Sequence, residues 1–148
     1  MKTFKDKESR QWEVKITIGS IERVKGLTGV DLLEDSGEDL QKVTGNPLTF
    51  GPVLFALVKP QADATGVNSE SFTDALAGDE LLAAMEAFEE EYIDFFPNPR
   101  KRQLIRTALE RAKKAENGLM DTIESRLPAV IDQLEERARA KLSSSLPE

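Results

Sequence analysis

Alternating apolar and polar residues predict a β-hairpin at the start of the chain. Trp12, Val14 and Ile16 alternate with polar residues over 11–17, the period-two pattern of a strand with one buried face. A second short run, at 3–5, precedes it, and the polar residues 6–9 lie between the two. Because two such strands joined by a short polar turn pair antiparallel, we expect them to form a hairpin.

The segment that follows is less regular. Ser20, after a glycine, is a candidate N-cap for a short helix that Gly26 and Gly29 interrupt. These glycines also match the backbone-clamping loop of one RNA-binding module, but a helix end explains them equally well. Further glycines and prolines make residues 35–52 irregular, and a compact apolar helix is expected at 53–59.

From Asn68 onward the chain has the pattern of helices. Asn68-Ser69-Glu70-Ser71 are candidate capping residues for a helix that ends near Gly78, and Asp79 begins the next one. This next helix ends before Pro97. Its apolar stripe, at three- and four-residue spacing, consists of Leu81, Leu82, Met85, Phe88, Tyr92, Phe95 and Phe96.

A final long helix begins at Asn98-Pro99, an N-cap with proline at the first helical position. We expect Pro128 to kink or divide it. Antiparallel packing of this helix on the preceding one would form a helical hairpin across Pro97. Its apolar stripe comprises Leu104, Ile105, Ala108, Leu109, Ala112, Leu119, Met120, Ile123, Val130, Ile131, Leu134 and Ala138.

These elements predict an α+β fold that is mostly α, with an N-terminal β-hairpin packed on a helical bundle and a long C-terminal helical hairpin. We expect residues 1–142 to form a single domain, and no internal repeat is apparent. Its parts are the hairpin (1–18), short helices and loops (19–67) and the helical region (68–142), followed by a flexible tail (143–148).

Composition excludes several classes of function. The 148 residues include no histidine and no cysteine, so histidine-based catalysis, disulfides and thiolate zinc sites are excluded. No apolar run is long enough to span a membrane, and the start lacks the apolar region of a secretion signal, so we expect a cytoplasmic protein. A net charge of −7 disfavours nucleic acid as a partner.

Acidic residues crowd the helix that ends before Pro97. Convergent carboxylates could hold a metal ion or form a paired-acid active site, but these lie mostly opposite the apolar stripe. We therefore expect a solvated acidic face and no catalytic, cofactor or metal site. The seven residues are Asp79, Glu80, Glu86, Glu89, Glu90, Glu91 and Asp94.

Basic residues follow directly in the final helix. They could pair with the acidic helix, within the chain or across a subunit interface, or dock a partner protein or bind nucleic acid. The seven are Arg100, Lys101, Arg102, Arg106, Arg111, Lys113 and Lys114, against one acid, Glu110. As candidate partner-binding residues we single out Arg100, Lys101, Arg102, Leu119, Ile123, Val130 and Leu134.

Several segments resemble the tail assembly chaperones encoded in tail-gene clusters of siphophage-like phages and prophages. The likeness spans about residues 4–102 and is one of overall pattern rather than of a catalytic signature. The segments that carry it are Phe4 with Trp12-x-Val14-x-Ile16, Arg23 to Leu33, Lys59 to Ala64, Phe72 to Asp79, and Asp94-Phe95-Phe96-Pro97.

This resemblance implies a non-enzymatic role. Such chaperones coat the long, aggregation-prone tape measure protein and help to recruit tail-tube subunits around it. It therefore implies the tape measure protein as partner, possible contacts with tail-tube subunits, and a homo-oligomer or many copies on one client. The alternatives are a structural tail or head–tail connector component and a prophage regulatory or nucleic-acid-binding factor.

Overall fold

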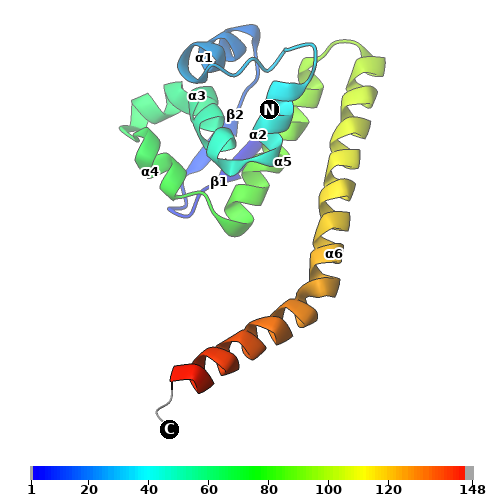
Figure 1. The fold of residues 1–148 in the computed structure, drawn as a ribbon. Helices are drawn as coiled ribbons and strands as arrows, with labels where there is room; N and C mark the ends of the chain where they lie inside the picture. The colour runs from blue at the N-terminus through cyan, green and yellow to red at the C-terminus, as the bar shows by residue number, and fades with distance from the viewer. Residues whose placement is uncertain (1, 146–148) are drawn as a thin grey trace. The chain divides into compact units, whose positions relative to one another are not determined.

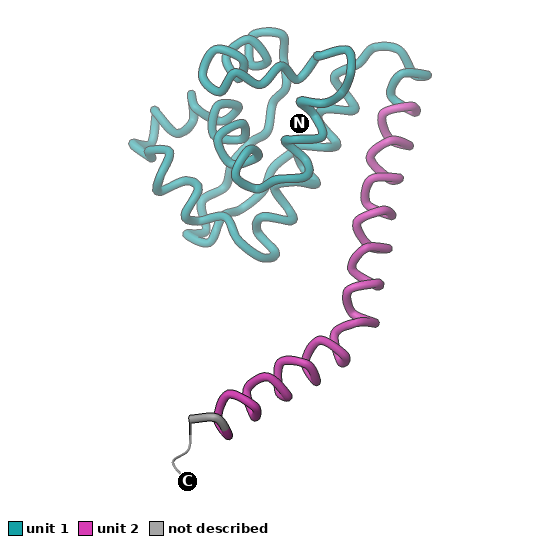
Figure 2. Tube along the Cα trace, in the orientation of Figure 1, with its two compact units in different colours: residues 1–102 teal, residues 103–148 magenta. Residues whose placement is uncertain are grey.

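The computed structural model describes residues 2–145, and their side chains as far as residue 143. The chain divides into two compact units, Met1–Arg102 and Gln103–Glu148 (Figure 2). The predicted class is confirmed, because the described chain is mostly helical, with an N-terminal hairpin packed against helices and a long C-terminal helix (Figure 1). That residues 1–142 behave as one domain stays a prediction.

The hairpin consists of β1 (Lys2–Lys5) and β2 (Gln11–Val14), paired antiparallel with Phe4 opposite Trp12. Helix α5 packs along β1 and helix α3 along β2 (Figure 1). β2 ends three residues earlier than predicted, although Ile16 beyond its end is buried. The alternating pattern therefore identified the buried face correctly and overestimated the length of the strand.

Helix α1 (Ile18–Thr28) begins before the predicted N-cap at Ser20. The Thr17 hydroxyl accepts a hydrogen bond from the Ser20 amide at 3.1 Å, and the Ser20 hydroxyl accepts one from the Thr17 amide at 2.8 Å. This reciprocal capping box makes Thr17 the N-cap and Ser20 the third helical residue. The helix runs through Gly26 and ends at Gly29, whose φ of 77° forms a left-handed C-cap.

The region predicted to be irregular contains two helices, α2 (Glu38–Gly45) and α3 (Pro47–Thr65). α3 is much longer than the predicted 53–59 because Asn46 caps it and Pro47 occupies its first position. It is the central helix of the first unit and contacts α1, α2, α4 and β2. Its buried residues include Phe50, Val53, Leu54, Leu57 and Val58.

Arg23 explains how α3 tolerates a proline in its interior. Pro60 has no N–H, so it cannot donate the helical hydrogen bond to the carbonyl of Ala56, which is only 1% exposed. The Arg23 guanidinium of α1 donates to that carbonyl instead, with an Nη1–O distance of 3.0 Å. The donor that Pro60 lacks is thus supplied by a residue of another helix.

We expect Arg23→Met to lower the free energy of unfolding by about 1–3 kcal/mol, because a buried carbonyl loses its donor. Pro60→Ala should recover part of the loss, since an alanine at this position has an N–H that can donate to the Ala56 carbonyl. Urea unfolding of the two single variants and the double variant measures this coupling. Lys25→Met, at an exposed position of the same helix, is the control and should change stability by less than about 0.5 kcal/mol.

Gln61 of α3 joins the central helix to the outer edge of β2. Its side-chain amide donates to the Glu13 carbonyl at 2.7 Å, and its side-chain oxygen accepts from the Glu13 N–H at 3.0 Å. These two backbone groups point away from β1, since Glu13 pairs with Thr3 at a site where the ladder bonds face outward. The Gln61 side chain therefore supplies the hydrogen-bond donor and acceptor that a neighbouring strand would otherwise provide.

Phe72 is the meeting point of the hairpin and the helices. It lies in α4 (Ser69–Asp74), which is capped by the side chain of Asn68, the first of the four predicted capping residues, and which ends before the predicted Gly78. Its ring has no exposed surface and contacts Phe4, Trp12 and Phe55 at centroid distances of 6.4, 5.0 and 5.5 Å. The hairpin and two helices thus share one aromatic cluster.

Helix α5 (Gly78–Phe95) buries a face that overlaps the predicted stripe only in part. Phe88 and Tyr92 of that stripe are buried, and the Phe88 ring lies 5.8 Å from that of Phe50, whereas Leu82 is 56% exposed. The Tyr92 hydroxyl donates to the Leu32 carbonyl at 2.7 Å, and burial together with nearby Asp31 raises the pKa of Tyr92 to about 12. The buried stripe starts at Ala84 and ends at Ile93, and comprises Ala84, Ala87, Phe88, Glu91, Tyr92 and Ile93.

Helix α6 (Pro99–Ser145) is continuous over 47 residues and begins at the predicted Asn98-Pro99 signal. Pro128 does not divide it; Figure 1 shows a bend in the orange part of the helix, which contains this proline. The helix includes three residues of the predicted tail, Ser143–Ser145, and residues 146–148 lie outside the described chain. The packing of α6 as a hairpin on α5 stays a prediction.

Candidate partner-binding surface

The largest set of exposed apolar side chains lies along α6. Every described side chain from residue 110 to 143 is exposed, apolar residues included. Eight large ones between Leu119 and Leu142 recur at three- and four-residue spacing, which places them on one face of the helix. They are Leu119, Met120, Ile123, Leu127, Val130, Ile131, Leu134 and Leu142, each between 45% and 64% exposed. We call these residues the α6 face.

Four of the predicted partner-binding residues belong to the α6 face, namely Leu119, Ile123, Val130 and Leu134. Scattered exposed apolar residues are normal in proteins, but a continuous apolar stripe marks an interaction surface. An isolated helix with this stripe would leave about half of each large side chain in water. The arrangement can therefore bind a partner by apolar burial, and that these residues do so stays a prediction.

The three predicted basic residues lie in the first turn of α6 and belong to the first unit. Arg102 donates through Nη1 to the carbonyl of Phe96 at 2.7 Å, beside the C-terminal end of α5. The Lys101 ammonium lies 4.6 Å from the centre of the Phe96 ring. Arg100 is exposed. Two of the three therefore hold the turn between α5 and α6, a structural role that sequence reasoning missed.

The acidic residues of α5 depart from the predicted solvated face at Glu91. Asp79, Glu86, Glu90 and Asp94 are exposed, but Glu91 is 9% exposed. Glu91 follows Ala84 by seven residues and Ala87 by four, so it falls on the buried face of the helix. The prediction failed at Glu91 because the predicted stripe runs through Leu81 and Met85, whereas the buried face is turned toward Ala84 and Ala87.

Lysines of the hairpin pair with two α5 acids. Lys2 lies 3.1 Å from Glu90, and Lys7 lies 3.3 Å from Glu80. All four side chains are partly exposed, so solvent screens each pair and it contributes little to the stability of the fold. Pairing of the acidic helix with the basic stretch of α6 stays a prediction. In that stretch Arg106, Arg111, Lys113 and Lys114 are exposed.

Asp6 is the most tightly held polar group of the hairpin turn, and sequence reasoning missed it. Its carboxylate accepts from Trp12 Nε1 at 2.9 Å, Arg10 Nε at 2.8 Å, and the amides of Glu8 and Arg10 at 2.9 and 3.0 Å. Burial alone would raise the pKa of Asp6, but the hydrogen bonds from Trp12 and Arg10 outweigh it and hold the pKa below its ordinary value. Each oxygen of this carboxylate accepts two hydrogen bonds, so the role of Asp6 is to hold the turn in place.

Residues 2–145 contain neither a cluster of possible metal ligands nor a helix that could span a membrane. Within that range no three acidic side chains gather as they would to hold a metal ion. No helix in the described chain has the length and apolarity needed to cross a membrane. Comparison with protein-family models, with curated proteins and with solved structures gives no match. The α6 face is therefore the candidate functional surface of the described chain.

Proposed function

We propose that this protein is a non-enzymatic tail assembly chaperone that binds a helical segment of a tape measure protein. The observation that carries the proposal is the α6 face, an apolar stripe of eight large residues that lies in water. Support also comes from the resemblance of residues 4–102 to such chaperones. A carrier for an aggregation-prone helical client needs an apolar surface that the client can reach and cover.

The chemistry of α6 favours a helical and apolar client. A helix presents its apolar residues as a narrow stripe, and the geometry that best covers such a stripe is another amphipathic helix. Apolar burial is not screened by salt, so the complex should persist at an ionic strength that dissociates charge-based complexes. Tail-tube subunits would be recruited to the complex, and the polar surface of the first unit would keep it in solution.

Co-expression with a tape measure protein should keep that client soluble and produce a complex that co-elutes on size-exclusion chromatography. Leu119→Asp and Ile123→Asp should abolish co-elution, because each places a charge in the apolar contact. The chaperone itself should remain folded, since both positions are exposed. Ser125→Asp, on the opposite side of α6, is the matched control and should bind as the wild type does.

Charge reversal at Arg100, Lys101 and Arg102 should weaken the complex only modestly, because apolar contacts supply most of its stability. A client that is equally soluble alone and never co-elutes would refute the chaperone proposal. In that case retention of the protein in purified virions would identify a structural tail or connector component. Steeply salt-dependent binding to DNA would instead identify a regulatory or nucleic-acid-binding factor.

A further inference from the structure

The α6 face is built from an 11-residue repeat. With α6 as one continuous helix, residues 119–129 align with residues 130–140 position by position. Apolar residues, acids and an arginine recur at the same places. The aligned pairs are Leu119 with Val130, Met120 with Ile131, Asp121 with Asp132, Ile123 with Leu134, Glu124 with Glu135, Arg126 with Arg137, Leu127 with Ala138, and Ala129 with Ala140. The repeat is not apparent from three- and four-residue spacing alone, which explains why none was predicted.

An 11-residue period has a definite structural meaning. Eleven residues make three turns of about 3.67 residues each, so the stripe stays on one face of a nearly straight or slightly right-handed helix. A helix that packs on a globular core needs no such regularity, because the core it covers is irregular. A repeat is favoured when the partner has the same period. The partner with the same period that is certain to be present is a second copy of α6.

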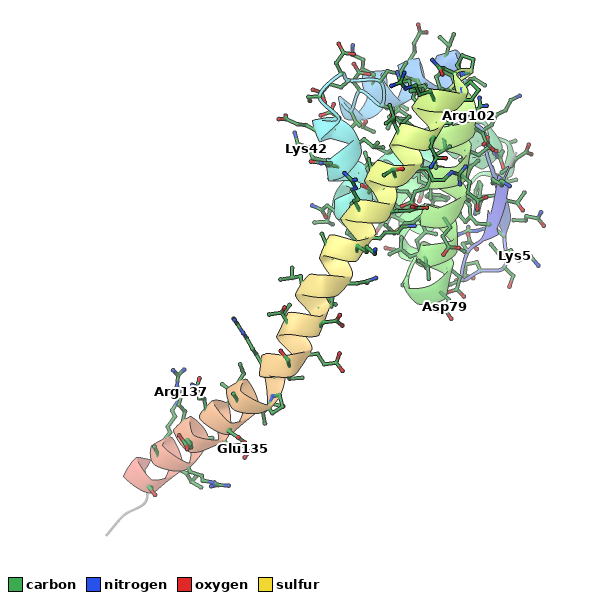
Figure 3. All side chains as sticks on the ribbon, turned by 90° about the vertical axis from the view of Figure 1, so that its right-hand side faces the viewer. Lys5, Lys42, Asp79, Arg102, Glu135 and Arg137 are labelled. Carbon is green, nitrogen blue, oxygen red and sulfur yellow. The ribbon has the colours of Figure 1, made fainter. Side chains whose placement is uncertain are left out.

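Charges border the α6 face in two separate rows. Glu124 and Glu135 directly follow the inward residues Ile123 and Leu134, which places both acids on one flank. Arg126 and Arg137 directly precede the inward residues Leu127 and Ala138, which places both bases on the other flank. Figure 3 shows the side chains of Glu135 and Arg137 on opposite sides of α6.

The two rows select the orientation of a second copy. In a parallel pair the twofold axis runs along the helices, so the acidic flank of each helix faces the basic flank of the other. Glu124 then lies two residues, or about 3 Å along the axis, from Arg126 of the second copy, and Glu135 lies equally close to its Arg137. In an antiparallel pair the axis is perpendicular to the helices, and like flanks would face each other.

The bend of α6 favours the same arrangement. Pro128 follows Leu127 by one residue, which places it about 100° around the helix and outside the apolar stripe. In a parallel pair in register both helices bend at the same height and can remain in contact on either side of the bend. An antiparallel or shifted pair would bring the bend of one helix against a straight part of the other.

We infer that α6 pairs with α6 of a second copy, parallel and in register, through residues 119–142. This pairing covers the α6 face when no client is bound. The inference goes beyond the chaperone proposal and does not rest on it, because the repeat, the charge rows and the bend concern the copies of this chain alone. A client helix with a matching stripe would compete with the second copy for the same face.

Disulfide cross-linking of the full chain tests both the pairing and its direction. The chain has no cysteine, so introduced thiols are the only ones present. Ile123→Cys alone and Ala138→Cys alone should each form a cross-linked dimer under mild oxidation, because each residue meets its own counterpart. A mixture of the two variants should give no link between them, since the two positions lie about 22 Å apart along the axis.

Three outcomes would overturn the inference. The first is a cross-link that forms only in the mixture, which would demonstrate antiparallel pairing. The second is absence of any cross-link together with a monomer in sedimentation equilibrium over the whole concentration range. The third is a monomer that binds the tape measure client, which would leave the proposed function intact. A cross-linked parallel dimer that does not bind the client would support the pairing and refute the chaperone proposal.

Charge variants provide an independent test at exposed positions. Changing Glu124 and Glu135 to arginine makes both flanks basic and should weaken the pair about tenfold in sedimentation equilibrium. Changing Arg126 and Arg137 to glutamate in the same chain exchanges the two rows and should restore the wild-type dissociation constant. A chain with all four changes that stays as weak as the first variant would contradict the proposed role of the flanks.

Discussion

Phe72→Ala should lower the free energy of unfolding by about 3–5 kcal/mol, the range for removing a fully buried phenylalanine. Its ring joins β1, β2 and α3 through Phe4, Trp12 and Phe55, so the cavity would lie where the hairpin meets the helices. Rigid surroundings collapse poorly, which favours the upper part of the range. Urea unfolding followed by tryptophan fluorescence measures the loss, because Trp12 lies 5.0 Å from the removed ring.

Leu82→Ala is the matched control for this truncation. Leu82 belongs to the apolar stripe predicted for α5, yet it is 56% exposed. Its replacement should therefore change stability by less than about 0.5 kcal/mol. A cost of several kcal/mol at Leu82, with little cost at Phe72, would mean that α5 buries the predicted stripe and that the hairpin does not pack as described.

Asp6→Asn should cost about 3–5 kcal/mol, although it changes only one atom. The new amide group would face two donors, Arg10 Nε and Trp12 Nε1, and hydrogen bonds to a charged acceptor are the strong ones. Breaking a buried charged pair from one side has a cost of this size. Asp35→Asn, at an exposed position, should be nearly neutral in the same unfolding experiment.

Acid should remove the contribution of Asp6 in wild-type protein. The pKa of Asp6 in the folded state lies below the ordinary value of 3.8, so the folded protein binds its proton less readily than the unfolded chain does. The stabilisation is fully present above that value and is lost as the pH falls through the folded pKa. Asp6→Asn should therefore show a flatter dependence of stability on pH in this acid range, and an unchanged slope would contradict the assignment.

Local signals in the sequence were sufficient for much of the fold. Asn68 and Asn98-Pro99 were recognised as helix starts because capping depends on a residue and its immediate neighbours. The hairpin followed from alternation alone. At α1 the same reasoning chose Ser20 instead of Thr17, since both residues of a capping box have the side chain of an N-cap.

Errors occurred where a distant residue determines the local structure. The prolines of the α3 region are residues that usually end a helix. Nothing near Pro60 in the sequence shows that Arg23 donates a hydrogen bond to the Ala56 carbonyl. Glu91 was expected on the surface because the predicted stripe did not include Ala84 and Ala87, the small residues that share its buried face. The carboxylate of Asp6 looked like an ordinary turn residue because Trp12 and Arg10 reach it only when the hairpin has formed.

The candidate surface was predictable in part. The apolar spacing predicted a stripe along the final helix, and Leu119, Ile123, Val130 and Leu134 are indeed exposed members of it. The 11-residue repeat escaped notice because its two copies share few identical residues and match in chemistry instead. Partner binding by the first turn of α6 stays a prediction, and the sequence did not indicate that the Arg102 guanidinium also donates to the Phe96 carbonyl.

The hydrogen bonds between Gln61 and Glu13 also bear on how the chain is made. During synthesis the hairpin leaves the ribosome well before Gln61, which follows Glu13 by 48 residues. Over that interval the outer edge of β2 is open, and an open edge is the part of a sheet that pairs with other chains. When α3 docks, the Gln61 side chain occupies the backbone groups of Glu13 at this edge, so another strand cannot pair with them. The nascent hairpin is thus most vulnerable to aggregation until the central helix has formed.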